Sequence, residues 1–397
     1  MPRTFLIPFC GLLLMLNAFS CDIMLPAFWS LQQSFGVPIE RAQSVIPVFL
    51  FSAGVGQLFA GPLSDRFGRK PVVVSGLLLY LAGLGVGLAA PNIEVLLAGR
   101  SLQGFGSAFG IVVGRAILRD TNSGPELART MALAFAIFSG GPILAPLLGF
   151  GLVTAGGWRA AYLGMIVFAT VVMTAALLRL VETNAAPNPR ALEPASLLAA
   201  ARRVLGHPQS RYFLAVAGVL TFAVTSFVTN APLLFKSAFG IEGFQFALLF
   251  ASTGVGIVFG QLANNRLIQR RGVVATTRLA ASVLASVAAA LVLLSYLDLL
   301  GIGIFLALMF VFNSSFLVVL SNCASLVIDP HHAIAGVASS MYGFLCQVTA
   351  STLVLITLPI YQGRMLPWAT GLLVVATLVL AAVLAYRPRP DAAAAKV

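Results

Sequence analysis

The sequence predicts an all-α polytopic membrane protein in which twelve membrane-spanning helices form two six-helix bundles with pseudo-two-fold symmetry. The chain is 59% hydrophobic and 9% charged, with a mean hydropathy of +0.98, and no soluble domain can cover so much apolar surface. Its apolar runs are long and continuous, which excludes an outer-membrane β-barrel. A long polar segment separates two sets of six runs, and part of the first set recurs in the second.

The apolar runs also give the boundaries of the predicted spans. We expect spans at residues 5–28, 42–63, 72–90, 94–118, 128–155, 160–180, 211–235, 244–264, 276–297, 300–328, 336–360 and 366–386. We divide the chain into an N-terminal six-helix bundle (1–180), a cytoplasmic linker with an amphipathic helix (181–210) and a C-terminal six-helix bundle (211–397). The first run ends at Asp22 and Pro26 without a small-residue cleavage site, and we therefore expect a retained span rather than a signal peptide.

The Lys and Arg residues predict the orientation in the membrane. One set of loops holds Arg41, Arg159, Lys236 and Arg364, two arginines lie within the fourth span, and 18 of the 24 basic residues fall in the other set of loops or at its helix ends. Because cytoplasmic loops are rich in Lys and Arg, we expect an inner (plasma) membrane protein with both termini in the cytoplasm. The net charge of +12 is then explained by loops, not by nucleic-acid binding.

An internal repeat supports the two-bundle organisation. The run Gly54-Val-Gly56 recurs as Gly254-Val-Gly256, and this register aligns Asp65 with Asn265. Six-span repeats are typical of secondary transporters, whose substrate site lies near the midplane between the halves.

The loop between the second and third spans carries a dense set of charges. It reads Gly61-Pro-Leu-Ser-Asp65-Arg66-Phe-Gly68-Arg69-Lys70. We expect Asp65 to end one helix and Gly68 to permit the turn, while the basic residues engage carbonyls or acids at neighbouring helix ends, with Asp120 as a candidate partner. Such a conformational latch would favour the outward-open state and break on inward opening. The alternative is plain topology, since any short cytoplasmic loop would be basic.

Two further motifs lie in the fourth and fifth spans. They are Gly99-Arg100-Ser-Leu-Gln103-Gly104-Phe-Gly106 and Ser139-Gly140-Gly141-Pro142-Ile-Leu-Ala-Pro146-Leu-Leu-Gly149. Together with the loop motif they resemble the signatures of the major facilitator superfamily. Cys21-Asp22-Ile-Met-Leu-Pro26 and Arg119-Asp120 resemble its Bcr/CflA-type drug/proton antiporters. The resemblance covers the whole chain and implies export of drugs or small metabolites in exchange for protons, through a cavity that opens to each side in turn.

The fifth-span motif resembles the signature of antiporters in that family. Its glycines and prolines are tolerated in membrane helices, where small faces allow close packing and proline opens a kinked point. We expect a hinge or a tight seal, formed by Gly140, Gly141, Pro142, Pro146 and Gly149. Ordinary helix packing is the alternative.

Asp22 is the candidate proton-coupling residue, because it is the one acidic residue placed well inside an apolar span. A carboxylate at membrane depth costs roughly 2.5–3.5 kcal/mol, and desolvation favours its neutral form. A group that gains and loses a proton in this setting is what proton coupling requires. The alternative is that Asp22 caps the outer end of a longer span beside Pro26.

Arg100 and Gln103 are expected to act with Asp22. An arginine at this depth needs a partner, and the resemblance places both residues near the inner end of the first span, facing the cavity. A positive charge near Asp22 would favour its ionised form. Alternatively, Arg100 lies near the periplasmic end and extends to the interface. Arg115 lies one turn before Arg119, and we expect it to be an interfacial anchor.

Polar residues within the spans are the remaining substrate-cavity candidates. Single polar residues in spans are mostly interhelical hydrogen-bonding groups. From this set we select Asn17, Asp22, Asn230, Asn313 and Tyr342.

Absent motifs narrow the function. Without a Walker-type phosphate loop, we expect an ion gradient to drive transport, with no cofactor and no metal. Without a nucleophile elbow or a His/Glu cluster, we do not expect an enzyme. The prediction is proton-coupled efflux of drugs or other small amphiphilic molecules by a monomer in the lipid bilayer, with no nucleic-acid partner. The alternatives are an exporter or symporter of a natural metabolite and, from another class, a helical membrane enzyme or receptor.

Overall fold

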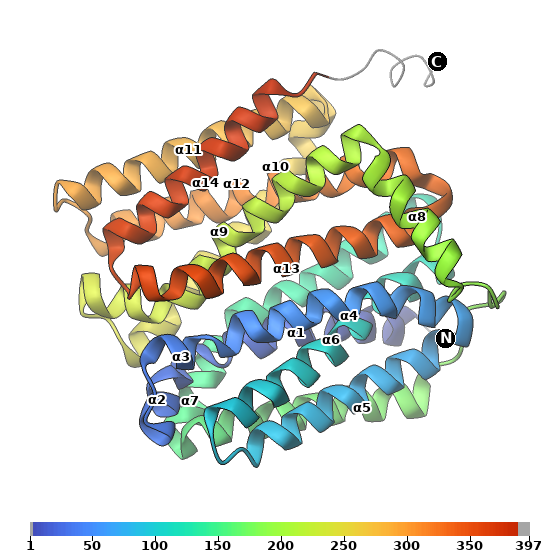
Figure 1. The fold of residues 1–397 in the computed structure, drawn as a ribbon, viewed down its shortest axis with the longest axis horizontal. Helices are drawn as coiled ribbons and strands as arrows, with labels where there is room; N and C mark the ends of the chain where they lie inside the picture. Colours follow the sequence, from blue (N-terminus) through green and yellow to red (C-terminus); the bar gives the residue numbers. More distant parts are fainter. Residues whose placement is uncertain (1–2, 388–397) are drawn as a thin grey trace.

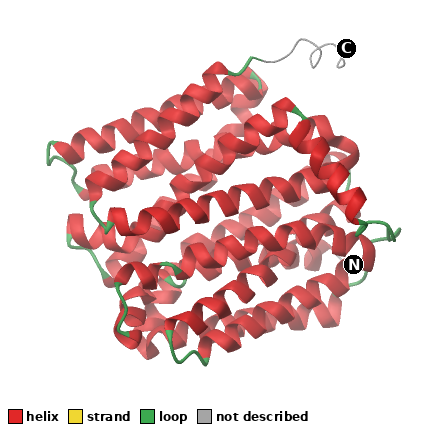
Figure 2. Ribbon diagram, viewed as in Figure 1, coloured by secondary structure: helices red, strands yellow, loops and turns green. Residues whose placement is uncertain are grey.

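The computed structural model describes residues 3–387, which are almost entirely helical and contain no strand (Figures 1 and 2). The first half comprises α1 (Arg3–Asp22), the 3₁₀ turn η1 (Leu25–Ala27), α2 (Phe28–Phe35), α3 (Ile39–Gln43), α4 (Val45–Phe67), α5 (Arg69–Leu88), α6 (Ile93–Thr121) and α7 (Gly124–Arg179). The linker forms α8 (Pro194–Gly206). The second half comprises α9 (Pro208–Phe239), α10 (Gly243–Arg271), α11 (Val273–Tyr296), α12 (Ile302–Ile328), η2 (Asp329–Ile334), α13 (Ala335–Tyr361) and α14 (Met365–Ala385).

The α7 element contains two membrane spans. Gly156 and Gly157 leave the helical conformation, and Gly157 has φ 65°, which glycine adopts without steric cost. A Cβ placed on Gly164 would lie 2.6 Å from Cδ1 of Leu152, so the chain reverses between them. With α7 divided here, the eleven long apolar helices of residues 3–387 give twelve spans. The predicted multi-pass fold is therefore confirmed.

The first span is longer than predicted and is broken in its middle. α1 ends at Asp22, a turn follows, and η1 and α2 continue to Phe35. Pro26 lies at the start of η1, where its missing N–H does no harm. The break therefore places Asp22 at a helix end, and η1 and α2 continue the apolar segment beyond it.

The two sets of helices lie side by side as two bundles, with α1–α7 in the lower half of Figure 1 and α9–α14 in the upper half. They meet where α4 contacts α13 and where α7 contacts α10. We call the end of the molecule that carries the Gly68 turn and α8 the linker end, on the right in Figure 1. The end that carries α2 and α3 is the opposite end.

The repeat has a different register from the one predicted. Gly68 (φ 97°, ψ 164°) and Gly272 (φ 77°, ψ 167°) precede α5 and α11 in matching turns. This register aligns Gly56-Gln-Leu58 with Gly260-Gln-Leu262, one helical turn away from the predicted alignment. The alignment of Asp65 with Asn265 is therefore wrong, and Gln269 occupies the place of Asp65. The second bundle still lacks the acidic residue of the loop motif.

The two bundles have different interiors. The core of the second bundle is aromatic, and rings of Phe227, Phe235, Phe305 and Trp368 lie within 5.5–6.4 Å of a neighbouring ring in this set. The core of the first bundle instead contains a fully buried arginine, Arg100. The buried Asp and Arg residues of the described range, Asp22, Arg69 and Arg100, all lie in the first bundle.

Candidate functional site

Asp22 is buried at the break in the first span. The residue is only 5% exposed, and its carboxyl group forms no hydrogen bond or ion pair with any residue in the described range 3–387. Next along the chain, the Ile23 carbonyl lies against Gly149 of α7 so closely that a Cβ at Gly149 would overlap it. The break in α1 is thus packed directly on the glycine- and proline-rich segment of α7.

Arg100 does not pair with Asp22 in this structure. Its guanidinium group donates to the carbonyls of Ser20 (3.0 Å) and Val45 (3.1 Å) and to Oε1 of Gln103 (2.7 Å). It also lies over the Phe49 ring, 4.5 Å from its centroid. The side chain is satisfied by neutral carbonyls near the opposite end, not at the expected inner end of the span, and one of these carbonyls belongs to Ser20, two residues from Asp22. The complete burial of Arg100 also excludes extension to the interface.

Tyr80 extends this polar core, whereas the hydroxyl of the buried Tyr162 has no hydrogen-bond partner among the described residues. Sequence reasoning missed both tyrosines. The Ser20 hydroxyl and the Tyr80 hydroxyl share a hydrogen bond of 2.5 Å, and Tyr162 is fully buried beside Trp158. Gln103 donates to Sδ of Met165. Buried tyrosines usually seek a polar partner, which was the available signal, but the partner could not be identified from sequence.

The predicted hinge residues of α7 separate into packed and open positions. Gly141 faces Met15 of α1, and a Cβ at Gly254 of α10 would lie 3.7 Å from Cβ of Pro142. Pro146 lies inside the helix, whereas a Cβ on Gly140 would meet nothing within 4 Å. The segment therefore joins α1 of its own bundle to α10 of the other.

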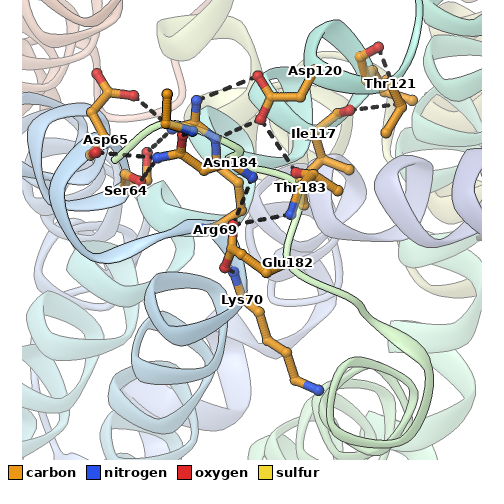
Figure 3. A network of polar contacts seen from close by, with 12 residues as sticks. Ser64, Asp65, Arg69, Lys70, Ile117, Asp120, Thr121, Glu182, Thr183 and Asn184 are labelled. Carbon is orange, nitrogen blue, oxygen red and sulfur yellow. Dashed lines mark hydrogen bonds and ion pairs between the residues drawn. The ribbon is translucent and has the colours of Figure 1, made fainter. Parts of the chain in front are cut away.

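Arg69 is the centre of the polar network at the linker end (Figure 3). Its Nε donates to Asp120 (2.8 Å), and its Nη1 donates to Asp65 (2.6 Å) and to the Ser64 hydroxyl (2.8 Å). Arg69 and Asp120 are largely buried and Asp65 is half exposed, so the charge-assisted bond to Asp120 is the better shielded from water. The network joins the ends of α4, α5 and α6.

The start of the linker completes this network, and sequence reasoning missed it. The Glu182 carboxylate accepts hydrogen bonds from the backbone N–H groups of Arg69 (2.8 Å) and Lys70 (3.0 Å), at the N-terminus of α5. Asn184 donates to the carbonyls of Ser64 and Asp65 at the C-terminus of α4. One short segment therefore caps two helices, which is favourable at both ends.

The pKa of Glu182 reflects this capping. Partial burial raises the pKa of the carboxyl group. Hydrogen bonds from the backbone N–H groups of Arg69, Lys70, Thr183 and Asn184 lower this pKa, and together they outweigh the effect of burial. The net result is a pKa below the ordinary value for glutamate. The carboxylate is therefore ionised throughout the physiological range.

The other predicted latch residues lie around this network. Arg66 is exposed over the Phe67 ring, Lys70 donates to the Leu177 carbonyl, and Gly61 faces the Ser340 hydroxyl of α13. Every hydrogen-bond and ion-pair partner of Arg69 among the described residues belongs to the first bundle or the linker. The expectation that these pairs break on inward opening therefore lacks support, because none of them crosses between the bundles.

The opposite end is sealed between the bundles. Gln43 donates to the Thr229 carbonyl (2.9 Å), and the Lys236 ammonium lies 5.0 Å from the centroid of the Trp29 ring. Phe150 and Phe244 have ring centroids 5.9 Å apart. These contacts close the molecule on that side.

A cavity of about 450 Å³ lies at the linker end, between the bundles. It is bounded by the ends of α4 and α6, by the start of α13 and by linker residues. It does not touch the five residues selected for the substrate cavity. These form helix contacts: Asn17 donates to Ser107, Asn230 to the Ser226 carbonyl, Asn313 to the Thr253 carbonyl and Tyr342 to the Leu320 carbonyl, while Asp22 lies at the α1 break.

Solved structures show the same fold. The human organic anion transporter MFSD10 superposes with a TM-score of 0.66 at 22% identity, covering 97% of this chain and 98% of that one. A D-xylose-proton symporter gives a TM-score of 0.73 at 14% identity, with coverages of 95% and 96%.

Sequence relatives extend over most of the chain. A bicyclomycin resistance protein homolog of Haemophilus influenzae is 27% identical over 84% of this chain and 83% of its own, and the MFS-type transporter YdgK of Bacillus subtilis is 27% identical over 84% of both chains. Multidrug resistance protein D of Escherichia coli is 29% identical over 60% of both. The family model for the Major Facilitator Superfamily matches residues 10–354, and the chain therefore belongs to this superfamily of membrane transporters.

Proposed function

We propose that this transporter exports drugs or other small amphiphilic molecules in exchange for protons, as an antiporter of the Bcr/CflA type. The main support is the environment of Asp22, whose carboxyl group is buried at a break in the first span and has no polar partner among the described residues. The names of the bicyclomycin and multidrug resistance relatives support the substrate class.

In the proposed cycle Asp22 is the proton carrier. Burial without a partner penalises the ionised carboxylate, so Asp22 binds a proton when its surroundings are sealed. Opening the path toward the cytoplasm hydrates the group and releases that proton. Substrate then binds in the opened cavity, and the loaded protein turns outward.

The packing around Asp22 supports this assignment. Arg100 holds the Ser20 carbonyl and thereby the end of α1, while Gly149 contacts the Ile23 carbonyl on the other side of Asp22. Movement of α7 against α10 would therefore alter the α1 break directly. This connection links the position of the bundles to the hydration of the carboxyl group.

We also propose that the linker end faces the cytoplasm of a bacterial inner membrane, with both termini on that side. The basic residues gather at this end, as cytoplasmic loops require. The protein then works as a monomer driven by the proton gradient, without a cofactor and without catalysing a chemical reaction.

The decisive experiment is proton-driven efflux from proteoliposomes, comparing the native chain with Asp22→Asn. A panel of cationic, neutral and zwitterionic compounds identifies transported substrates. We expect efflux to follow the imposed pH gradient and to be lost in Asp22→Asn. Uphill efflux with a normal pH dependence in that variant would show that Asp22 is structural and that the coupling group lies elsewhere.

A further inference from the structure

The cavity at the linker end extends well into the protein. Its wall on α4 runs from Gln57 to Asp65, and Gln57 lies about 15 Å from the end of that helix. Four linker residues complete the enclosure: Asn188, Ala191, Leu197 and Ala200. A small molecule can therefore be largely surrounded here.

Two arginines of α6 face this cavity without carboxylate partners. Within residues 3–387, Arg115 and Arg119 form no ion pair, whereas the cavity's two acids, Asp65 and Asp120, are both bound by Arg69. The three arginines of the wall, Arg69, Arg115 and Arg119, outnumber its two aspartates, so the wall carries a net positive charge. The surplus lies along α6, where Arg115 and Arg119 are one turn apart.

Arg115 has an unsatisfied donor. Its Nε atom is buried and has no hydrogen-bond partner, and the guanidinium carbon lies 5.8 Å from the centroid of the Phe135 ring. A buried N–H group without an acceptor is costly. The terminal Nη groups of Arg115 also have no hydrogen-bond partner among the described residues, and they are the atoms that remain open to an acceptor of a ligand in the cavity.

The first turn of α13 adds a second anion-favouring element. Ala335, Gly336 and Val337 line the cavity, and the N-cap residue of this 27-residue helix, Ile334, forms no side-chain capping hydrogen bond. The N-terminus of a helix favours negative charge. The hydroxyl groups of Ser339 and Ser340 lie on the same wall.

We propose that this cavity binds the anionic group of a small amphiphilic carboxylate, held between Arg115, Arg119 and the start of α13. The apolar part of the ligand would lie against Pro62, Val112 and Ala116, which line the same space. The inference rests on the proposed function only where it names the bound carboxylate as a substrate taken from the cytoplasm. It assigns this transporter a preference for anionic or zwitterionic compounds over purely cationic ones.

The test is binding to the full chain in nanodiscs made only of phosphatidylcholine, so that no anionic lipid competes. The probes are naphthoate, naphthamide and naphthylmethylamine, which share a ring and differ in charge. We expect naphthoate to bind about tenfold more tightly than the amide, and Arg115→Gln or Arg119→Gln to weaken naphthoate binding about tenfold. The exposed Arg202 lies on α8 outside the cavity wall, and Arg202→Gln should leave binding unchanged.

Equal binding of naphthoate and the neutral amide by the native chain would overturn the inference, and this comparison requires no variant to fold. So would native-like naphthoate affinity in both Gln variants. Adding phosphatidylglycerol to the nanodiscs tests the lipid as the occupant: if it displaces naphthoate at low mole fraction, the site takes a lipid headgroup and the substrate assignment is wrong. Proton-driven efflux is measured in parallel. If the protein binds the three probes equally but still shows efflux that depends on Asp22, this inference alone is rejected. If it prefers naphthoate but shows no proton-driven efflux, the proposed function is rejected.

Discussion

Gly104 and Asn313 occupy equivalent positions in the two bundles and make the same helix contact in different ways. Gly104 of α6 lies directly against the Phe49 carbonyl of α4, leaving no space for a side chain. Asn313 of α12 instead donates from Nδ2 to the Thr253 carbonyl of α10, at 3.1 Å. A residue that sequence reasoning assigned to the substrate cavity is therefore a helix-packing residue.

This relationship predicts different costs for two substitutions. Asn313→Ala removes one interhelical hydrogen bond and should lower the free energy of unfolding by only about 0.6–1.7 kcal/mol, with transport unchanged. Gly104→Ala should cost more, because its Cβ would overlap a backbone carbonyl. Unfolding in detergent measures both. A transport defect in a stable Asn313→Ala protein would contradict the packing role.

Arg100→Gln should destabilise the first bundle. The substitution leaves the buried carbonyls of Ser20 and Val45 without their donor, at an expected cost of about 2–3 kcal/mol. Arg66→Gln is the control, because Arg66 is exposed and its replacement should change stability by less than about 0.5 kcal/mol. Denaturant unfolding of both variants gives the comparison, and equal stabilities would show that the hydrogen bonds of Arg100 contribute nothing net.

Gly149→Ala should separate proton coupling from folding. The added Cβ would overlap the Ile23 carbonyl, so α1 and α7 must move apart at the residue next to Asp22, with a stability cost of about 1–3 kcal/mol. Proton-driven efflux should fall sharply, although the chain still folds. Gly140→Ala is the matched control: its Cβ would meet open space, and efflux should be native-like. Native efflux in Gly149→Ala would rule out a role for this contact.

Glu182 should contribute stability in a defined pH range. Because its pKa is lowered in the folded protein, its contribution is fully present above the ordinary glutamate pKa and is lost as the pH falls through the lower folded value. The native chain should therefore melt at a higher temperature than Glu182→Gln from pH 7 to pH 5, and the difference should shrink below about pH 4. Thermal melting in buffered detergent measures this. A difference that stays constant to pH 3 would mean that ionisation of Glu182 is irrelevant.

Much of the architecture could be predicted from sequence. Hydropathy alone located the spans, and the glycine pair at Gly156 and Gly157 explains why the fifth and sixth spans separate. The loop motif required a turn at Gly68, where φ is 97°. These features depend on local chemistry, which a sequence displays directly.

The remaining features depend on packing between distant segments. Arg100 was expected to need partners, and backbone carbonyls of α1 and α4 meet that need as a carboxylate would. Every residue has a backbone carbonyl, so a sequence does not indicate which ones will accept these bonds. Glu182 looked like an ordinary loop acid until folding placed it at the start of α5. The repeat was misaligned because two short matches compete. Gly54-Val-Gly56 is identical to Gly254-Val-Gly256, and Gly56-Gln-Leu58 is identical to Gly260-Gln-Leu262, which requires a shift of one helical turn.

The attachment of the linker sets how far the bundles can separate at that end. Asn188 is hydrogen-bonded to the Asp65 carbonyl of the first bundle at 2.9 Å, while α8, beginning at Pro194, packs on α9 and α13 of the second. The free tether between them has a maximum reach of about 20 Å. This segment is folded into turns, in which the backbone N–H of Ala191 donates to the Asn188 carbonyl and that of Glu193 to the Arg190 carbonyl. It is therefore shorter than its extended length and could lengthen if these turns opened. If one bundle moves away from the other at this end, the length of this segment limits the distance.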